Sequence, residues 1–254
     1  MLGGIRITPI GGIKLVEPGD DLASLLLDGL AESGLALEDG DIVAVAQKVV
    51  SKAEGRQVDL ATVEASGEAC RLAEETDKDP RLVQLILDES TEVVRKKPGV
   101  LIVRHRLGLV GAHAGVDQSN VDHGTGASAL LLPKDPDASA TRIRRALMDA
   151  TGQHIGVLIT DSANRPWRLG TVGIAIGAAG IAVLDDRRGG NDLYGRELKV
   201  TLINRADSLA SAATLAMGET TERTPAALIR GFPAEEVQQS AADIPRALEE
   251  DLFR

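Results

Sequence analysis

Apolar runs and amphipathic helical patterns follow one another along this chain without the regular strand–helix alternation of a doubly wound fold. Patterns typical of buried strands lie at 2–10, 42–46, 155–160, 197–203 and 226–230, with a hairpin at 100–110. Helical patterns lie at 21–33, 59–75, 80–96, 139–151 and 206–217. Residues 170–184, rich in Gly, Ala, Ile and Val, fit either packed strands or a tightly packed helix. This irregular order predicts an α+β fold of mixed sheets with flanking helices.

The composition restricts what the core can be made of. Hydrophobic residues are 43% of the 254 residues, but aromatic residues are only 2%, so the core must consist of Ala, Val, Ile and Leu. The 27 glycines indicate many turns and close backbone approaches. Because there is no internal repeat or obvious linker, we expect a single domain over 1–254, of which only the acidic tail at 233–254 is peripheral.

Charge and cysteine content argue against several classes of function. The net charge of −10 disfavours a general nucleic-acid or anionic-membrane binder, although a small anionic ligand needs only a local basic pocket. The single cysteine, Cys70, excludes an intrachain disulfide and a Cys-based zinc site. The first residues show no secretory signal, and no apolar run approaches the ~18 residues of a membrane span. We therefore expect a cytoplasmic protein.

Four polar segments each follow an expected strand, and core packing does not require them. They lie at 9–14, 47–56, 117–122 and 161–168. Ligands of open sheets commonly bind where the loops at one edge of the sheet converge. We therefore expect these segments to meet in one site.

Two acids in these segments are candidate metal ligands. Asp117 and Asp161 lie just past apolar strands, with Asn120 near the first and Ser162 beside the second. Carboxylate, amide and hydroxyl oxygens suit Mg²⁺ or Mn²⁺ better than zinc. The alternative is that these residues only cap turns after strands, and sequence spacing does not show whether the two acids meet.

Basic side chains mark candidate positions for an anionic substrate. Lys52 lies in the second polar segment, and Arg165 and Arg168 flank Trp167, the only tryptophan. A guanidinium binds a carboxylate or phosphate in two-point geometry. A second basic cluster, DDRRGGNDLYGRE, lies at 185–197. The alternative for both clusters is that the arginines are solvated surface residues.

Several well-known motifs are missing from the sequence. There is no GxxxxGK[ST], no GxGxxG after a strand and no GxSxG, and the four histidines form no metal-spaced pair. A nucleotide would therefore have to bind without a P-loop or a Rossmann fingerprint.

Seven ordered segments together resemble the coenzyme F420-0:L-glutamate ligase family, also called F420 gamma-glutamyl ligases. They are GIKLVEPGDDL, VVSKAEGR, GVDQSNVD, LLLPKDPDASA, GVLITDSANRPWRLGTVGIAIG, DLYGREL and LAMGE. The set spans about residues 9–230. It is similar to the stand-alone form of the family rather than to the form fused to a nitroreductase-like domain.

The resemblance implies a fold like that of the F420 gamma-glutamyl ligases and an intertwined homodimer. It also implies an enzyme that uses GTP to join L-glutamate to the lactyl carboxylate of coenzyme F420-0, through an acyl phosphate, and then extends a gamma-linked tail. The implied cofactors are Mn²⁺ or Mg²⁺ at two sites, and a monovalent cation such as K⁺ is a further candidate.

The resemblance also implies roles for individual residues. The metal ligands would be Asp117, Asp161, Ser162 and Glu219, and the catalytic residues would be Asp117, Asp161 and Lys52. The nucleotide contacts would be Gly11, Gly12, Ile13, Lys14, Gln47, Lys52 and Asn120. Arg165, Trp167 and Arg168 would shape the substrate entrance. The sequence departs from the family pattern in two places, with Ser162 where threonine is frequent and Gln47 where serine occurs.

Two other functions are compatible with the same residues. A metal-dependent phosphohydrolase built on the two acids would release phosphate from GTP without needing F420-0 or glutamate. A non-enzymatic regulator would bind GTP without turnover.

Overall fold

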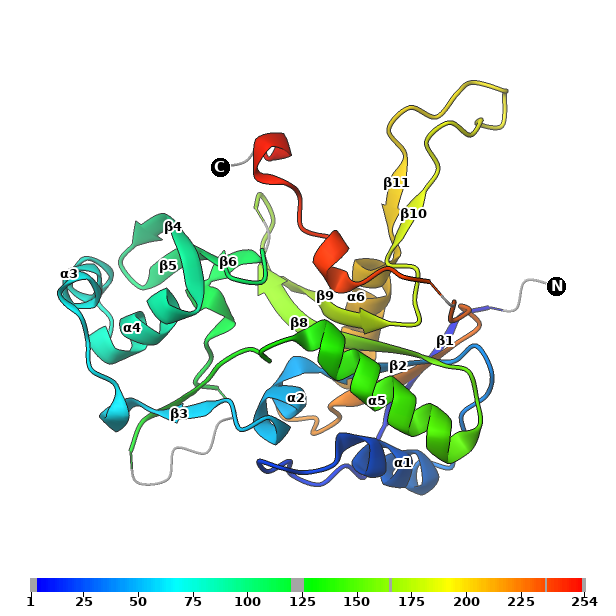
Figure 1. Ribbon diagram of the computed structural model, residues 1–254, viewed down its shortest axis with the longest axis horizontal. Coiled ribbons are helices and arrows are strands. Elements are labelled where there is room, and N and C mark those ends of the chain that lie inside the picture. The colour runs from blue at the N-terminus through cyan, green and yellow to red at the C-terminus, as the bar shows by residue number, and fades with distance from the viewer. Residues whose placement is uncertain (1–3, 120–125, 165, 236, 253–254) are drawn as a thin grey trace.

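The computed structural model describes residues 4–119, 126–164, 166–235 and 237–252 (Figure 1). Its main sheet has five strands in the order β1 (Arg6–Ile10), β12 (Ala226–Arg230), β2 (Ile42–Ala46), β8 (Gly156–Asn164) and β9 (Thr171–Ala179). Only β2 and β8 are parallel, and the other neighbouring strands are antiparallel. The predicted α+β class with mixed sheets is confirmed.

Helices cover both faces of this sheet. On β2, Val43 and Val45 face the core beneath α1 (Leu22–Glu32) and α5 (Pro136–Thr151). Ile42 and Ala44 face the opposite core beneath α6 (Arg205–Met217). Successive side chains of a strand point to opposite faces, so a strand buried on both faces is apolar throughout, as this one is. Both cores consist mainly of Ala, Val, Ile and Leu, as the composition predicts.

A smaller unit is built from a three-stranded antiparallel sheet and two helices (Figure 1). Its strands are β4 (Ser90–Lys97), β5 (Val100–His105) and β6 (Val110–Ala112), and its helices are α3 (Gly67–Thr76) and α4 (Pro80–Asp88). It has a hydrophobic core of its own. The two-stranded ladder of β3 (Gln57–Asp59) and β7 (Ser128–Leu130) connects it with α2 (Gln47–Ala53) and α5.

A long hairpin projects from the main body, as Figure 1 shows. It starts and ends in the two-stranded ladder of β10 (Leu184–Asp186) and β11 (Leu202–Asn204). Leu193, Tyr194 and Val200 lie on it with 98%, 96% and 87% of their surfaces exposed. Four short 3₁₀ helices complete the described chain, at Leu60–Thr62, His113–Gly115, Ala241–Asp243 and Leu248–Glu250.

Several expectations are wrong in type or length, and of the strand predicted at 197–203 only the start of β11 (Leu202–Asn204) is a strand. The helix predicted over 80–96 ends at Asp88, and 90–97 form β4, where the β-branched Thr91, Val93 and Val94 favour an extended backbone. The helical pattern at 59–75 begins only at Gly67, after a 3₁₀ turn. The polar segment at 47–56 is largely the helix α2.

The acidic tail is also less peripheral than predicted, because Ala241 is 4% exposed and packs into the core beneath α6. Among the described residues, no helix is both long and apolar enough to cross a bilayer.

Candidate active site

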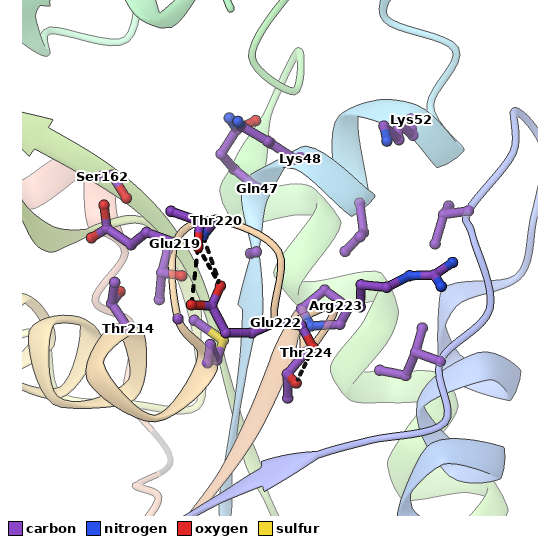
Figure 2. Close-up of a pocket in the computed structure, with 18 of the residues that line it drawn as sticks. Gln47, Lys48, Lys52, Ser162, Thr214, Glu219, Thr220, Glu222, Arg223 and Thr224 are labelled. Atoms are coloured by element: carbon purple, nitrogen blue, oxygen red, sulfur yellow. Dashed lines mark hydrogen bonds between the residues drawn. The ribbon is translucent and has the colours of Figure 1, made fainter. Parts of the chain in front are cut away.

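A cavity of about 620 Å³ opens beside the ends of β2 and β8. All four polar segments of the sequence contribute to its lining, and a fifth segment joins them. The lining stretches are Ile13–Val16, Ala46–Val49 with Lys52, Asp117 with Ser119, Thr160–Ser162, and Met217–Pro225. Figure 2 shows several of these side chains around the cavity. The predicted convergence of the four segments is confirmed.

The parallel pairing of β2 and β8 explains why the acid at 161 meets the start of α2. Ala46, the last residue of β2, is in register with Thr160 of β8. Parallel strands run toward the same edge of a sheet, so Gln47 and Asp161 follow at the same edge. Strand β8 continues to Asn164, so Asp161 lies within a strand and not in the loop that the sequence predicted.

Asp117 reaches the same cavity from a strained turn. His113, Ala114 and Gly115 have consecutive positive φ angles of 58°, 54° and 65°. A Cβ at Gly115 would lie 2.9 Å from the side chain of Leu132, so this turn requires glycine at its end. Asp117 then exchanges two backbone hydrogen bonds with Leu130, which fixes the start of its side chain.

The two carboxylates are close enough to influence each other. Burial raises the pKa of Asp161 to about 6, and the negative charge of Asp117 adds to this effect. The Ser162 amide, Gln47 and Lys48 act in the opposite direction but do not outweigh it. For Asp117 burial also opposes ionisation, but hydrogen bonds from Lys48 and Ser119 and the charge of Lys48 lower its pKa. The ionised form of Asp117 is therefore favoured, whereas Asp161 has too little positive charge nearby to offset the effect of its burial.

Lys48 is a pocket residue that the sequence analysis did not single out. Its Nζ lies 2.6 Å from Asp117 Oδ2 and donates to Ser119 Oγ at 2.8 Å. The available signal in the sequence was that Lys48 follows the end of the apolar strand 42–46 by two residues, within one of the four polar segments.

Gln47 also occupies a different environment from the one predicted. It is 3% exposed, and its Oε1 accepts a hydrogen bond from Ser51 Oγ at 2.9 Å. Its side chain also favours the ionised form of Asp161, which follows the neighbouring strand at the same edge of the sheet. Gln47 therefore lies beside an acid of the site, and its contact with a nucleotide stays a prediction.

The predicted basic and glycine residues are distributed unevenly around the cavity. Lys14 and Lys52 line it, and Lys14 Nζ pairs with Asp20 Oδ1 at 2.8 Å. Gly11 and Gly12 precede the lining stretch, and Gly12 has a φ of 71° that shapes the turn.

The other two predicted metal ligands, Ser162 and Glu219, lie at one end of the cavity. Ser162 and Glu219 both line it, and Figure 2 shows them at the same end. Glu219 Oε2 accepts a hydrogen bond from Thr171 Oγ1 at 2.9 Å. Among the residues that the structure describes, no three His, Cys, Asp or Glu side chains gather as a metal-binding group. A metal held by one or two carboxylates with water and phosphate oxygens is still chemically consistent with this donor set.

The loop between α6 and β12 contributes residues that the sequence analysis missed. Gly218 and Arg223 have positive φ angles of 77° and 56°. The carboxylate of Glu222 accepts hydrogen bonds from the Thr220 amide and hydroxyl, and these bonds close the loop on itself. Arg223 is exposed, and Figure 2 shows it extending toward the loop between β1 and α1. The polar run GETTERTP was the available signal.

The predicted substrate entrance does not coincide with the cavity. Trp167 is 88% exposed on the turn between β8 and β9, and neither it nor Arg168 belongs to the lining. Arg187 and Arg188 of the second basic cluster pair with Asp185 and Asp186 on the projecting hairpin, outside the cavity. The predictions for Asn120 and Arg165 fall outside the described residues.

Comparison with known proteins identifies similar sequences along nearly the whole chain. The family described as F420-0:Gamma-glutamyl ligase matches residues 12–231. A coenzyme F420:L-glutamate ligase of Methanopyrus kandleri is 48% identical over 260 residues, which cover 100% of both chains. Proteins of the same name from Methanothermobacter thermautotrophicus and Archaeoglobus fulgidus are 45% and 41% identical, and the matches cover 99% and 98% of this chain and 99% and 96% of theirs.

Proposed function

This chain belongs to the F420-0:gamma-glutamyl ligase family, and from that premise we propose that it joins L-glutamate to coenzyme F420-0 with GTP and a divalent metal. Membership makes the chain a ligase. The names of its relatives support F420 and glutamate as substrates. GTP, the metal, the acyl phosphate and the extension of the tail are the finer parts of the proposal.

The observation that carries the proposal is the meeting of opposite charges in one cavity. Asp117 and Asp161 lie together there, and Lys52, Lys14 and Arg223 line its walls. A carboxylate pair suits a divalent metal, and cationic side chains suit phosphates and carboxylates. This combination is expected where a nucleoside triphosphate reacts with an acid.

The residues present fit a metal of this kind, because they offer two interacting carboxylates with a hydroxyl and a third carboxylate nearby. Asp117 and Asp161 would hold one ion, and Ser162 and Glu219 would contribute to the second. When bound, the metal would neutralise phosphate oxygens whose charge shifts during transfer.

The reaction that we propose has two steps. A carboxylate oxygen of F420-0 attacks the γ-phosphorus of GTP, and GDP leaves as the acyl phosphate forms. The amine of glutamate then attacks the acyl carbon, the carbon–nitrogen bond forms, and inorganic phosphate leaves as the amine loses a proton. Lys52 and Arg223 would position the phosphates, since phosphoryl transfer depends mainly on positioning and charge neutralisation.

We also propose that the enzyme works as a homodimer. The projecting hairpin carries Leu193, Tyr194 and Val200 almost fully exposed, which is unfavourable for a lone chain in water. Two-fold dimers are the commonest oligomers, and a second copy could cover these side chains.

The test is to incubate the protein with F420-0, GTP, Mn²⁺ and L-glutamate and to look by mass spectrometry for F420 with added glutamate. Replacing GTP by ATP at equal concentration should slow product formation strongly. Release of phosphate from GTP that is equally fast without F420-0 and glutamate would favour a phosphohydrolase. Binding of GTP without any turnover would favour a regulator.

A further inference from the structure

The first two residues of α2 each lie beside one of the two acids in the cavity. We propose that Lys48 is a built-in counter-cation of the Asp117–Asp161 pair that a divalent metal must displace, while Gln47 holds Asp161 in place for that metal. This inference rests on the proposed metal site at these acids. It assigns opposite effects on metal binding to two further residues: Lys48 would weaken it, and Gln47 would strengthen it.

Lys48 holds the position that a cation would take at Asp117. Its Nζ lies 2.6 Å from Asp117 Oδ2, which is contact distance for an ammonium and a carboxylate oxygen. The side chains of Lys48 and Asp117 are 29% and 34% exposed, so water screens the pair only in part. Lys48 also interacts favourably with the charge of Asp161. A single ammonium thus partly compensates both acids.

The same ammonium and a divalent metal would compete for the same oxygen. Two cations cannot share Asp117 Oδ2 at contact distance without strong mutual repulsion. Lys48 has another partner available, because its Nζ also donates to Ser119 Oγ at 2.8 Å and lies 3.4 Å from the Ser119 carbonyl oxygen. On release from Asp117 it would keep these hydrogen bonds.

Gln47 has the opposite role because it carries no charge. Ser51 Oγ donates to Gln47 Oε1, so the amide nitrogen of Gln47 is the group available to donate to Asp161. The pairing of Ala46 with Thr160 places Gln47 and Asp161 next to each other at the edge of the sheet. Gln47 and Ser51 are 3% and 0% exposed, which holds this relay in one orientation. A hydrogen bond to a metal-binding carboxylate fixes its orientation without competing for the metal.

The test measures Mn²⁺ affinity by calorimetry, without nucleotide, at low ionic strength. Lys48→Met keeps the unbranched side chain up to the position of Cε and removes the charged ammonium. We expect this variant to bind Mn²⁺ about tenfold more tightly than the wild type, as for loss of a competing cation near a partly exposed acid. Its metal-free form should also unfold at a lower temperature, and saturating Mn²⁺ should reduce this difference.

Lys14→Met is the matched control. Lys14 lines the same cavity, but it is paired with Asp20 and not with Asp117. Its replacement should leave the Mn²⁺ affinity within about twofold of wild type, since screening weakens its effect at a distance. If Lys48→Met does not fold, Lys48→Gln tests the same loss of charge while retaining a donor for Ser119.

Gln47→Ala should change the affinity in the other direction, lowering it by about tenfold as for loss of a partner of a metal ligand. Equal or weaker Mn²⁺ binding by the Lys48 variants would overturn the role of Lys48, and unchanged binding by Gln47→Ala would overturn that of Gln47. Asp117→Asn separates these results from failure of the metal site. If the wild type binds no Mn²⁺, or Asp117→Asn binds it equally well, the proposed metal site itself is wrong.

Discussion

The guanidinium of Arg56 lies 2.8 Å from the carboxylate of Glu89, and this ion pair joins the end of the pocket helix α2 to the end of α4 in the smaller unit. Arg56 also donates to the Leu132 carbonyl. Glu89 is further contacted by His105 at 3.2 Å and by Arg106 at 3.1 Å. The side chain of Glu89 is only 12% exposed, so its contacts with Arg56, His105 and Arg106 are largely shielded from water.

We expect Glu89→Gln to lower the free energy of unfolding by about 3 kcal/mol, because it leaves sheltered cationic groups without their partner. Urea unfolding at pH 7 measures this loss. Glu75→Gln is the control, since Glu75 pairs with Arg71 on the surface and its side chain is 38% exposed. A loss at Glu89 no greater than that at Glu75 would contradict the prediction.

The same carboxylate should give the protein an acid-sensitive contribution to stability. Burial opposes its ionisation, but hydrogen bonds to His105 and Arg56 and the charges of Arg56 and Arg106 lower the pKa of Glu89 from 4.5 to about 2. The stabilisation is therefore complete above about pH 4.5 and is lost as the pH falls toward 2. The difference in stability between wild type and Glu89→Gln should shrink over this range. A difference that stays constant from pH 6 to pH 3 would argue against it.

Asp161→Asn should reduce ligase turnover by at least about a hundredfold, because an amide cannot offset the charge of a metal as a carboxylate does. The folded protein should keep or gain stability without metal. Burial raises the pKa of Asp161 to about 6, so its ionised form destabilises the metal-free fold increasingly as the pH rises from 3.8 through 6, and Asn removes this penalty. Turnover assays and thermal unfolding at pH 7.5 measure both effects. Near-normal turnover by a well-folded variant would refute the assignment.

Arg223→Gln should raise the KM for GTP about tenfold, as for loss of one charge-assisted hydrogen bond to a phosphate. Arg223 lines the cavity from the loop between α6 and β12, whereas Lys48, which contacts Asp117, belongs to α2. Its loss should therefore leave the Mn²⁺ affinity without nucleotide nearly unchanged. Initial rates at varied GTP, together with calorimetry, check this separation. A KM equal to that of the wild type would remove Arg223 from the phosphate site.

Light scattering at low micromolar concentration should give a mass near twice the 26.6 kDa of one chain. Changing Leu193 and Tyr194 together to serine should weaken the dimer, because these side chains lie exposed on the projecting hairpin and would bury their apolar surface on association. Leu252→Ser is the control, since Leu252 is 89% exposed but lies near the C-terminus. A wild-type mass of one chain that does not change on concentration would refute the dimer.

The sequence determined most of the local structure because the signals for it are local. The run 42–46 is apolar at every position and forms a strand buried on both faces. Asp21 caps α1 through the Ala23 amide, and Pro80 is the first residue of α4, which are positions that these residue types favour. Polar residues after strands also indicated which segments meet at the cavity. These features depend on neighbouring residues, whose preferences a single sequence carries.

The assembly of the site depends on contacts between segments that are far apart in the sequence. The parallel placement of β2 beside β8 brings Gln47 to Asp161, and the turn before Asp117 brings that acid to Lys48. The strand β4 was likewise missed, since pairing with β5 overrides its helical periodicity. Contacts between residues far apart in sequence depend on strand order and packing, which local periodicity and spacing do not encode.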